Sequence, residues 1–479
     1  ISEVSHYNIC EIFEAELILY MKEATRRQRL DMLNGPIWNK LPQFALPVAA
    51  TAILGQLFNA ADVAVVGNFT GAGKTVAVAA VGANSAVIGL IINLFIGIAL
   101  GCNVVIAHAI GRRDSDAVQR AVHTSVVVAV IGGIIVGLLG QLIAAPLLGL
   151  LNVPDEVFPL ALLYLRIYLV GLPVILLYNF EAAIFRSVGE TRVPLIALTL
   201  SGILNVVLNL FFVAVLNMSV SGVAIATVIS NVVSSVILFV KLRRTELDIR
   251  IDPKKLRIDL PILRRILGIG LPAGVQSSLF SVSNIVIQSA INSLGTVVMA
   301  ASSAAFNIEI LTFDIIDAFS QACTTFVGQN YGAGKIERCK KTLKLCMLEG
   351  LAALVLAIGI LLFFGKPLLS IFNNDPKVVE TGYIRLMYVM FSHIFNLLYN
   401  VMSGYLRGFS ISLAPAILTM LGVCGMRIAW IHYVFPLSPT FKTIMIAYPV
   451  SLGITALMIS AAVLYYRPSK RFAGTRDTV

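Results

Sequence analysis

The two halves of this chain repeat one another at a constant offset. Cys102 aligns with Cys323 and Gly111 with Gly332, and in each pair the second residue lies 221 positions after the first. The same offset, without a gap, relates Pro146 to Pro367, Asn152 to Asn373, Asn179 to Asn400, Arg186 to Arg407 and Pro194 to Pro415. Such a repeat requires a fold of two like halves. In a chain that crosses a membrane many times, this is typical of transporters whose substrate site lies between the halves.

Composition places the chain in a membrane. Hydrophobic residues make up 58% of the 479 residues and charged residues 13%, which leaves too little polar surface for a soluble protein. The apolar runs are long enough to cross a hydrocarbon core of about 30 Å, and β-barrel alternation is absent. They predict helices over residues 42–67, 77–109, 119–150, 156–187, 192–216, 219–241, 266–293, 297–330, 342–371, 378–408, 412–435 and 441–466. The predicted fold is an all-α membrane protein of twelve transmembrane helices in two pseudo-symmetric six-helix bundles.

The positive charges indicate orientation in the membrane. The net charge is +11, and most of the 36 Lys and Arg residues fall in alternate connections, which we place on the cytoplasmic side. The opposite connections hold only Lys74, Lys366, Lys377 and Lys442. This asymmetry predicts a multi-pass protein of the plasma (inner) membrane with both termini cytoplasmic. It gives no reason to expect nucleic acid as a partner.

The longest basic connection, around Pro253, divides the chain. The predicted parts are an N-terminal cytoplasmic segment 1–35, an N-lobe 36–240, a cytoplasmic linker 241–265, a C-lobe 266–467 and a cytoplasmic tail 468–479. We expect the linker to lie at the membrane surface and to leave the angle between the lobes free. Because residues 1–20 hold no Lys or Arg and precede Met21, we expect Met21 to be the natural start.

Asp62 is the charged residue that fits least well inside a span. A charge in lipid is costly unless it is paired or lines water, so each one is a candidate functional group. No cation lies within reach of Asp62 on its own helix, and the repeat places Val286 or Ile287 opposite it. Such a carboxylate can bind a proton, a metal ion and a cationic ligand in turn. The alternative is a structural Asp bonded to backbone or to Asn neighbours.

Three polar side chains are expected at the depth of Asp62. Asn205 and Asn209 share one face of the fifth span, since they are spaced i, i+4, and Thr227 lies on the sixth. With Asp62 they could hold a small hard cation such as Na⁺, or satisfy a protonated carboxyl. Asn and Thr also join helices within membranes, and spacing alone gives both interpretations equal weight.

Three acidic residues, Glu309, Asp314 and Asp317, lie on one side of the second C-lobe span. They would be costly facing lipid, so we expect this side to line a substrate cavity for organic cations. The alternative is structural pairing with Arg385 or Arg427.

Two further residues are expected at moving parts. Glu181 lies near the inner end of the fourth span, before Arg186, and we expect a gating or pairing role at the cytoplasmic rim. Pro47, which corresponds to Pro272 in the repeat, should bend the helix that carries Asp62. An ordinary packing kink is the alternative for Pro47.

Several motifs resemble those of the MATE (multidrug and toxic compound extrusion) transporters, and the resemblance covers roughly residues 32–467. They are Asp31–Trp38, Phe58–Gly67, Leu204–Asn209, Gly222–Thr227, Gly270–Ser278 and, most specifically, Phe326–Lys335. The resemblance implies two six-helix lobes in a V. It also implies alternating access and export of organic cations driven by proton or sodium entry.

The resemblance also assigns roles to residues. In the DinF-like branch an N-lobe site uses a helix 1 Asp, an Asn and an Asp on helix 5 and a helix 6 Thr. Asp62, Asn205 and Thr227 match this set, whereas Asn209 replaces the second acid. A single acid favours protons over Na⁺, and by analogy protonation of Asp62 would bend helix 1 at Pro47. The C-lobe acids of the NorM-like branch correspond here to Ser281 and Asn396, so that site is expected to be absent.

We therefore expect an ion-coupled (H⁺ or Na⁺) antiporter that exports amphipathic organic cations and drugs. It is expected to be a monomer in the lipid bilayer, with no cofactor and no enzymatic activity. A flippase for lipid-linked oligosaccharides is the nearest alternative, but it would need several Arg or Lys in its cavity. A polytopic membrane enzyme would need a nucleophile–base pair or a metal-ligand set within the spans, and the sequence offers no convincing one.

Overall fold

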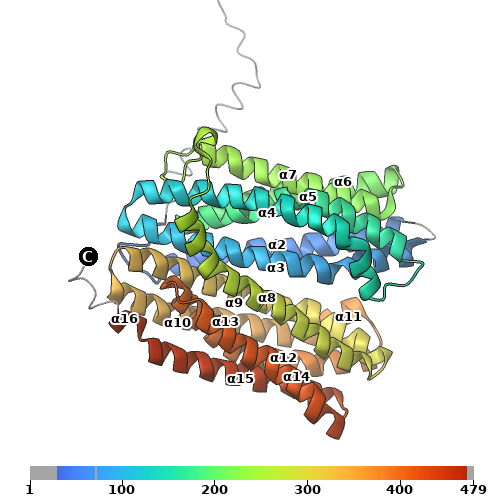
Figure 1. Cartoon of the computed structure of the whole chain (residues 1–479). Coiled ribbons are helices and arrows are strands. Elements are labelled where there is room, and N and C mark those ends of the chain that lie inside the picture. Colours follow the sequence, from blue (N-terminus) through green and yellow to red (C-terminus); the bar gives the residue numbers. More distant parts are fainter. Residues whose placement is uncertain (1–29, 71–72, 472–479) are drawn as a thin grey trace, which may run out of the picture.

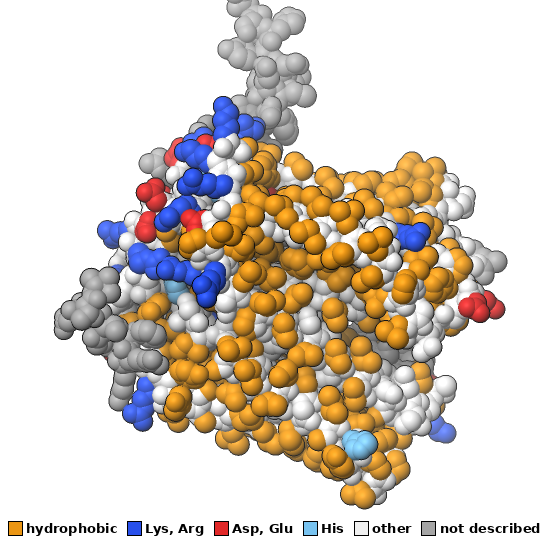
Figure 2. Space-filling model, viewed as in Figure 1, with side chains coloured by type: hydrophobic (Ala, Val, Ile, Leu, Met, Phe, Trp, Pro, Cys, Tyr) orange, Lys and Arg blue, Asp and Glu red, His pale blue; other side chains and the backbone are white. Residues whose placement is uncertain are grey.

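The computed structural model describes residues 30–70 and 73–471, and it is helical in every predicted span (Figure 1). The prediction that residues 1–20 are foreign concerns a segment outside these ranges. Most of the N-terminal segment and of the tail also lie outside them. Below, "inner" means the end that the charge asymmetry places in the cytoplasm. In Figure 2 many Lys and Arg side chains gather toward one end, on the left, beside a broad apolar surface.

Eleven described helices are long and apolar enough to cross a membrane, and a further one, α12, has 33 residues and carries polar groups inside the bundle. The N-lobe holds α2 (Lys40–Phe69), α3 (Lys74–Arg112), α4 (Ser115–Leu150), α5 (Phe158–Ser187), α6 (Arg192–Asn209) with the π-helical turn η2 (Leu210–Val215), and α7 (Ser219–Arg244). The C-lobe begins with α8 (Leu260–Asn292), α9 (Thr296–Gly332), α10 (Ile336–Phe363), the short α11 (Gly365–Phe372) and α12 (Pro376–Gly408). Its last two spans are α13 (Leu413–Thr419) continued by η4 (Met420–Gly425), α14 (Met426–Ala429), η5 (Trp430–Val434) and η6 (Phe435–Leu437), and then α15 (Phe441–Tyr466). The predicted fold of six spans in each lobe is confirmed.

Two capping aspartates set where α4 and α8 begin at the inner side. The Asp114 carboxylate accepts the backbone N–H of Ala117 at 2.9 Å and so caps α4. The Asp259 carboxylate accepts the N–H of Ile262 at 3.1 Å and caps α8. Such caps satisfy N–H groups that the first turn of a helix leaves unpaired. Both helices therefore start directly after a charged connection.

Glycines let the lobes meet backbone to backbone in their inner halves. A methyl group added at Gly97 of α3 would lie 2.1 Å from the Gly274 nitrogen of α8. One added at Gly111 of α3 would lie 2.1 Å from the Gln329 oxygen of α9, and one at Gly332 would meet α3 at 2.3 Å. Small residues allow this approach between membrane helices. Because Gly111 and Gly332 are a repeat pair, the pseudo-two-fold axis passes between them.

Two hydrogen bonds join the lobes at the inner end, and the sequence repeat relates one to the other. Nε2 of His108 on α3 lies 2.8 Å from the carbonyl oxygen of Gly408 at the end of α12. Nε2 of Gln329 on α9 donates to the carbonyl of Ser187 at the end of α5, at 2.7 Å. His108 and Gln329 are related by the repeat offset, and so are Ser187 and Gly408. We call these two contacts the inner latch.

The contacts between the lobes reach outward only to about mid-depth. Among the described residues, the outermost side-chain hydrogen bonds between α3 and α8 run from Asn93 Nδ2 to Ser281 Oγ, at 3.2 Å, and from Ser278 Oγ to the Leu90 carbonyl, at 3.1 Å. The bond from Thr325 Oγ1 to the Asn103 side chain (2.9 Å) lies further in. The described lobes are therefore held together on the inner side.

The first helix of each lobe packs partly on the other lobe. On α2, the inner residues Leu41, Phe44 and Val48 are buried in one hydrophobic cluster with Phe326 of α9. The segment before α2 joins the same lobe, because Arg338 of α10 donates to the carbonyl oxygens of Met32 (3.1 Å) and Gly35 (2.9 Å). The start of the N-lobe is thus docked on the C-lobe.

The linker is docked in the same way on the N-lobe, which differs from the expectation of a connection that leaves the lobe angle free. Ile249 and Ile251 are buried in the N-lobe core. The backbone N–H of Asp252 donates to Nε2 of His123 on α4, at 3.1 Å. The inner residues of α8, including Ile266, belong to the same core. Ile249 and Ile251 alternate with charged residues, so their side chains lie on one face of the linker and are buried together. This burial holds the linker on the N-lobe although most of its residues are polar.

We expect Gly111→Val to weaken inner closure. The added carbons would collide with the backbone of α9, and overpacking of this kind costs about 1–3 kcal/mol. Spin labels at Arg113 and Lys341, both exposed, should report a longer or broader distance distribution by pulsed electron resonance. Gly359→Val on α10 is the matched control, because a methyl group there meets nothing within 4 Å. Identical distributions in wild type and Gly111→Val would contradict this account.

Candidate functional site

Asp62 lies inside the N-lobe where α2, α6 and α7 meet. The residue is 7% exposed. Nδ2 of Asn209 donates to Asp62 Oδ1 at 2.5 Å, and Oγ1 of Thr227 lies 3.2 Å from Asp62 Oδ2. Asn209 Nδ2 is also 3.2 Å from Oδ1 of Asn205. The structure thus brings together the four side chains that depth alone had placed at one level.

Close packing around a glycine positions α2 against α6. A methyl group at Gly202 would lie 1.9 Å from the ring of Phe58, so this ring occupies the place of a side chain on α6. Phe58 is one turn before Asp62 on α2, and Gly202 is just before Asn205 on α6. One packing contact therefore sets the distance between the carboxylate and the amides.

The π-helical turn η2 begins directly after Asn209. Isolated π turns are uncommon in helices and occur frequently at functional sites. The C-lobe has a π turn within one residue of the corresponding place, since η5 starts at Trp430, which the repeat aligns with Asn209. This irregularity therefore belongs to the shared frame of the two lobes.

The described residues supply polar partners to Asp62 but no ion pair, because none of their salt bridges includes it. Tyr164 and Tyr168 of α5 are close enough to interact with its charge, and their rings stack at 6.4 Å. Oδ1 of Asn209 is buried and has no hydrogen-bond partner within the described chain. The site therefore holds a carboxylate and one unused amide oxygen, without a neutralising cation.

The matching positions of the C-lobe form an apolar cluster instead. Ile287 takes the place of Asp62, Trp430 that of Asn209 and Tyr448 that of Thr227. Ile287 and Tyr448 are buried in one hydrophobic cluster, and Trp430 packs against it. The two lobes thus share a frame but not a polar site.

Glu309 is paired, unlike the other two acids of α9. Its Oε1 lies 2.5 Å from NH2 of Arg385 on α12, and its Oε2 accepts from Nε at 3.0 Å. Both side chains are buried, and Arg385 NH1 also donates to Ser302 Oγ at 2.6 Å. The expectation that Glu309 lines a substrate cavity is therefore replaced by its alternative, structural pairing with Arg385. Arg385 stands on another helix at a distance in sequence that no spacing rule reveals.

Asp314 and Asp317 form no ion pair within the described chain. Oδ2 of Asp314 is buried without a hydrogen-bond partner among the described residues. Asp317 is half-buried, and its Oδ2 accepts from Nε2 of Gln321 at 2.7 Å. Arg186 and Arg407 lie close enough to interact with the charge of Asp317, although neither forms a salt bridge with it. Asp314 and Asp317 remain the cavity-lining candidates on α9.

Glu181 lies in the interior of the N-lobe and not at a wet rim. Glu181 is fully buried, and its Oε2 accepts from Ser235 Oγ on α7 at 2.9 Å. It forms no ion pair with Arg186 within the described residues, so pairing at the rim is not what this structure contains.

α2 continues through Pro47, whose carbonyl accepts from Thr51 at 2.7 Å. A gating role for either Glu181 or Pro47 stays a prediction.

Ser281 and Asn396 occupy the positions where the resemblance expects acids in another branch. Ser281 bonds Asn93 of the opposite lobe, and Asn396 is buried and accepts from Asn400 at 2.6 Å. Arg427 is also buried here, with its guanidinium 4.4 Å from the centre of the Tyr448 ring. The C-lobe thus buries the arginines Arg385 and Arg427, whereas the N-lobe buries acids, among them Asp62 and Glu181.

Sequence reasoning assigned no role to His108 and passed over Gln329. The inner latch contains both, and a usable signal existed, because the repeat itself pairs these residues and pairs Ser187 with Gly408. Helical spacing could not show which carbonyl each side chain reaches.

Comparison with known proteins places the chain among membrane transporters. The MatE family model matches residues 47–211 and 272–431. The "Probable multidrug resistance protein NorM" of Thermotoga maritima is 28% identical over 400 residues, which cover 82% of this chain and 84% of that protein. An "FAD transporter" of Shewanella oneidensis is 28% identical over 364 residues, which cover 74% of this chain and 78% of that protein.

A solved structure, the outward-facing conformation of a multidrug resistance MATE family transporter of the MOP superfamily, superposes with a TM-score of 0.85. It is 22% identical to this chain, and the match covers 93% of this chain and 99% of that one. At this identity the likeness establishes the fold alone.

The pairing of Glu309 predicts a stability effect. Glu309→Gln leaves Arg385 buried without its acid, and breaking a buried pair costs about 3–5 kcal/mol. Thermal unfolding of the purified protein should therefore occur at a clearly lower temperature. The double variant Glu309→Leu/Arg385→Met should recover much of the loss, whereas Asp317→Asn, which breaks no ion pair, should change little. A Glu309→Gln protein as stable as wild type would contradict the structural role.

Proposed function

Since the chain belongs to the MATE (multidrug and toxic compound extrusion) family of transporters, we propose that it is an ion-coupled antiporter that exports amphipathic organic cations. Asp62 is the proposed coupling residue. The observation that carries this proposal is a carboxylate buried among three helices with polar partners and no neutralising cation. A charge in this setting is retained where a mobile cation compensates it.

Hydrogen bonding around Asp62 supports the proton as the coupling ion. Thr227 has one hydroxyl hydrogen and two acceptors in reach, Asp62 Oδ2 at 3.2 Å and the Val223 carbonyl at 2.9 Å. A proton on Oδ2 would let the carboxyl group donate to Thr227 while Thr227 donates to Val223. Every hydrogen then has an acceptor. The protonated form therefore suits the site without rearrangement.

Sodium is the second candidate ion. It prefers oxygen ligands, and the site offers Asp62, Thr227, Asn205 and the unengaged Oδ1 of Asn209. The set holds one formal negative charge, because Asn209 is an amide rather than an acid. A small cation gains less from such a site than from one with two carboxylates. We therefore favour the proton.

The proposed cycle couples Asp62 to the angle between the lobes. With the inner halves packed, the site would take up its ion from the outer side. Neutralising Asp62 removes the charge that orients the Asn209 and Thr227 side chains. Release on the inner side requires that the inner latch and the glycine contacts separate. Substrate export and ion entry then share one rocking motion in opposite directions.

The proposed substrate class follows from the free charges. Asp314 and Asp317 are acids without an ion pair in the described chain, and they would attract an organic cation. Aromatic surface near them, Phe313 stacked at 6.1 Å on Phe280, would hold its apolar part. An anionic substrate, such as a lipid pyrophosphate or a flavin dinucleotide, would need free cations. Arg385 is paired and Arg427 is stacked on aromatic rings, so neither favours that class. Arg407 is buried, donates to Gln276 at 2.9 Å and lies close enough to Asp317 to interact with its charge.

We further place the protein in the plasma membrane with both termini cytoplasmic, acting as a monomer without a cofactor. The family is one of transporters, and nothing in the proposed mechanism calls for an enzymatic step.

We expect Asp62→Asn to abolish efflux driven by a pH gradient, because the amide cannot gain or lose a proton. Vesicles with an acidic side opposite the loaded fluorescent cation would measure it, alongside a sodium gradient at equal pH. Asp155→Asn, an exposed acid in an outer connection, is the matched control and should transport normally. Retained pH-driven transport in Asp62→Asn would refute the assignment. Transport driven by the sodium gradient alone would show that Na⁺ is the ion.

We expect Asp314→Asn/Asp317→Asn to weaken the binding of cationic dyes. Removing two negative charges from one wall should lower affinity by roughly thirtyfold, at about 1 kcal/mol for each charge near ε of 80 and 4 Å. Fluorescence titration of the purified protein would measure this change, with an uncharged dye of similar size as the control. If the variant bound the cationic dye as tightly as wild type does, these acids would have only a structural role.

A further inference from the structure

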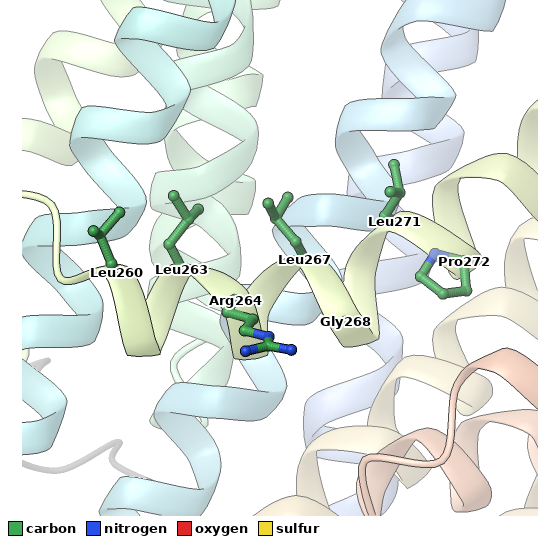
Figure 3. A pocket seen from close by; sticks show the side chains of 7 residues that line it. All are labelled: Leu260, Leu263, Arg264, Leu267, Gly268, Leu271 and Pro272. Carbon is green, nitrogen blue, oxygen red and sulfur yellow. The ribbon is translucent and has the colours of Figure 1, made fainter.

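The inner half of α8 carries a hollow on its surface that the proposed transport site does not use. Its volume is about 500 Å³. Figure 3 shows four leucines, Leu260, Leu263, Leu267 and Leu271, that point to the same side of the helix. Arg264 points away from them, and Gly268 leaves the helix surface bare. The hollow is thus lined by the four leucines, by the bare surface at Gly268, which we call the notch, and by the cation Arg264.

Neither Arg264 nor Gly268 is engaged by the rest of the described protein. Arg264 is exposed, and no hydrogen bond or ion pair of the described residues includes it. A methyl group built at Gly268 would meet no atom within 4 Å. The cation and the notch are therefore both open to a molecule from outside the chain.

The dimensions of the hollow match one leaflet of a bilayer. α8 starts at Leu260, directly after a basic connection that contains Lys254, Lys255 and Arg257. At 1.5 Å per residue, Arg264 lies about 6 Å along the helix from Leu260, and Leu271 lies about 16 Å along it. Half of a hydrocarbon core is about 15 Å thick. The leucines thus extend over the depth of an acyl chain, and Arg264 lies near the headgroup level.

We propose that this hollow binds one anionic phospholipid of the cytoplasmic leaflet. Its phosphate pairs with Arg264, and one acyl chain lies along the leucines and over Gly268. Guanidinium groups bind phosphate through charge-assisted hydrogen bonds, and a Lys or Arg near the cytoplasmic surface attracts anionic lipid headgroups. The bare glycine gives the chain a place that a plain leucine surface would not offer.

The position of the lipid connects it to the lobe interface. Gly270 and Gly274 pack α8 against the backbone of α3. They belong to the same stretch of helix as Arg264 and Gly268. A lipid bound there would stabilise the packed inner arrangement. This inference needs only the membrane fold, and it is independent of the ion and of the substrate.

The experiment uses the full chain in nanodiscs that contain phosphatidylglycerol and phosphatidylcholine with identical acyl chains. Native mass spectrometry after release would count the lipids that each protein retains. Wild type should retain phosphatidylglycerol preferentially. Arg264→Ala should lower that preference about fivefold, which corresponds to one basic residue near a membrane surface. Gly268→Leu should lower retention of both lipids, because the leucine fills the notch.

Two matched variants test the position of the effect. Arg244→Ala removes an exposed cation at the end of α7, and Gly359→Leu fills an open glycine on α10. Both should bind lipid as wild type does, and thermal unfolding should show that all four variants are folded. An equal loss in Arg244→Ala and Arg264→Ala, or no lipid preference in wild type, would overturn the proposal. Displacement by inorganic phosphate at equal concentration would also overturn it, because it would identify a phosphate site without a lipid.

Discussion

The close backbone contact between the lobes is the constraint on which the rest of the structure depends. Four glycines, Gly97 with Gly274 and Gly111 with Gly332, bring helices of opposite lobes together where any side chain would separate them. Lipid gives no hydrophobic driving force for helix association, so such contacts must come from close packing and hydrogen bonds. The inner latch adds two hydrogen bonds at the same end. A close-packed interface of this kind cannot deform continuously, so its helices either stay in contact or separate.

The two lobes use the same frame for different purposes. The repeat places Asp62 opposite Ile287 and Thr227 opposite Tyr448, so a polar site in one lobe is a hydrophobic cluster in the other. The C-lobe carries its charges elsewhere, in the buried pair of Glu309 and Arg385. The interior is therefore asymmetric within a symmetric frame, and the polar cluster around Asp62 belongs to the N-lobe.

Much of this fold could be predicted from the sequence, because the length of an apolar run is set by the thickness of the bilayer. The depth of Asp62, Asn205, Asn209 and Thr227 could also be predicted, since depth follows from counting residues along each helix. Contacts that depend on helix rotation could not. The partner of Glu309 was left open for this reason. The docking of the linker was missed because its polar composition concealed the few residues that anchor it.

The first helix of each lobe, α2 or α8, packs in its inner part against the other lobe. The inner part of α2, with Phe44, is packed into the C-lobe, while its outer part, with Val66, belongs to the N-lobe core. α2 is therefore packed into both lobes. A rotation of one lobe relative to the other must be accommodated by the stretch of α2 between these two packing contacts. Asp62 lies within that stretch, near its outer end, and Pro47 lies near its start. A change in the curvature of α2 would therefore move Asp62 relative to Asn209 and Thr227, which lie on other helices.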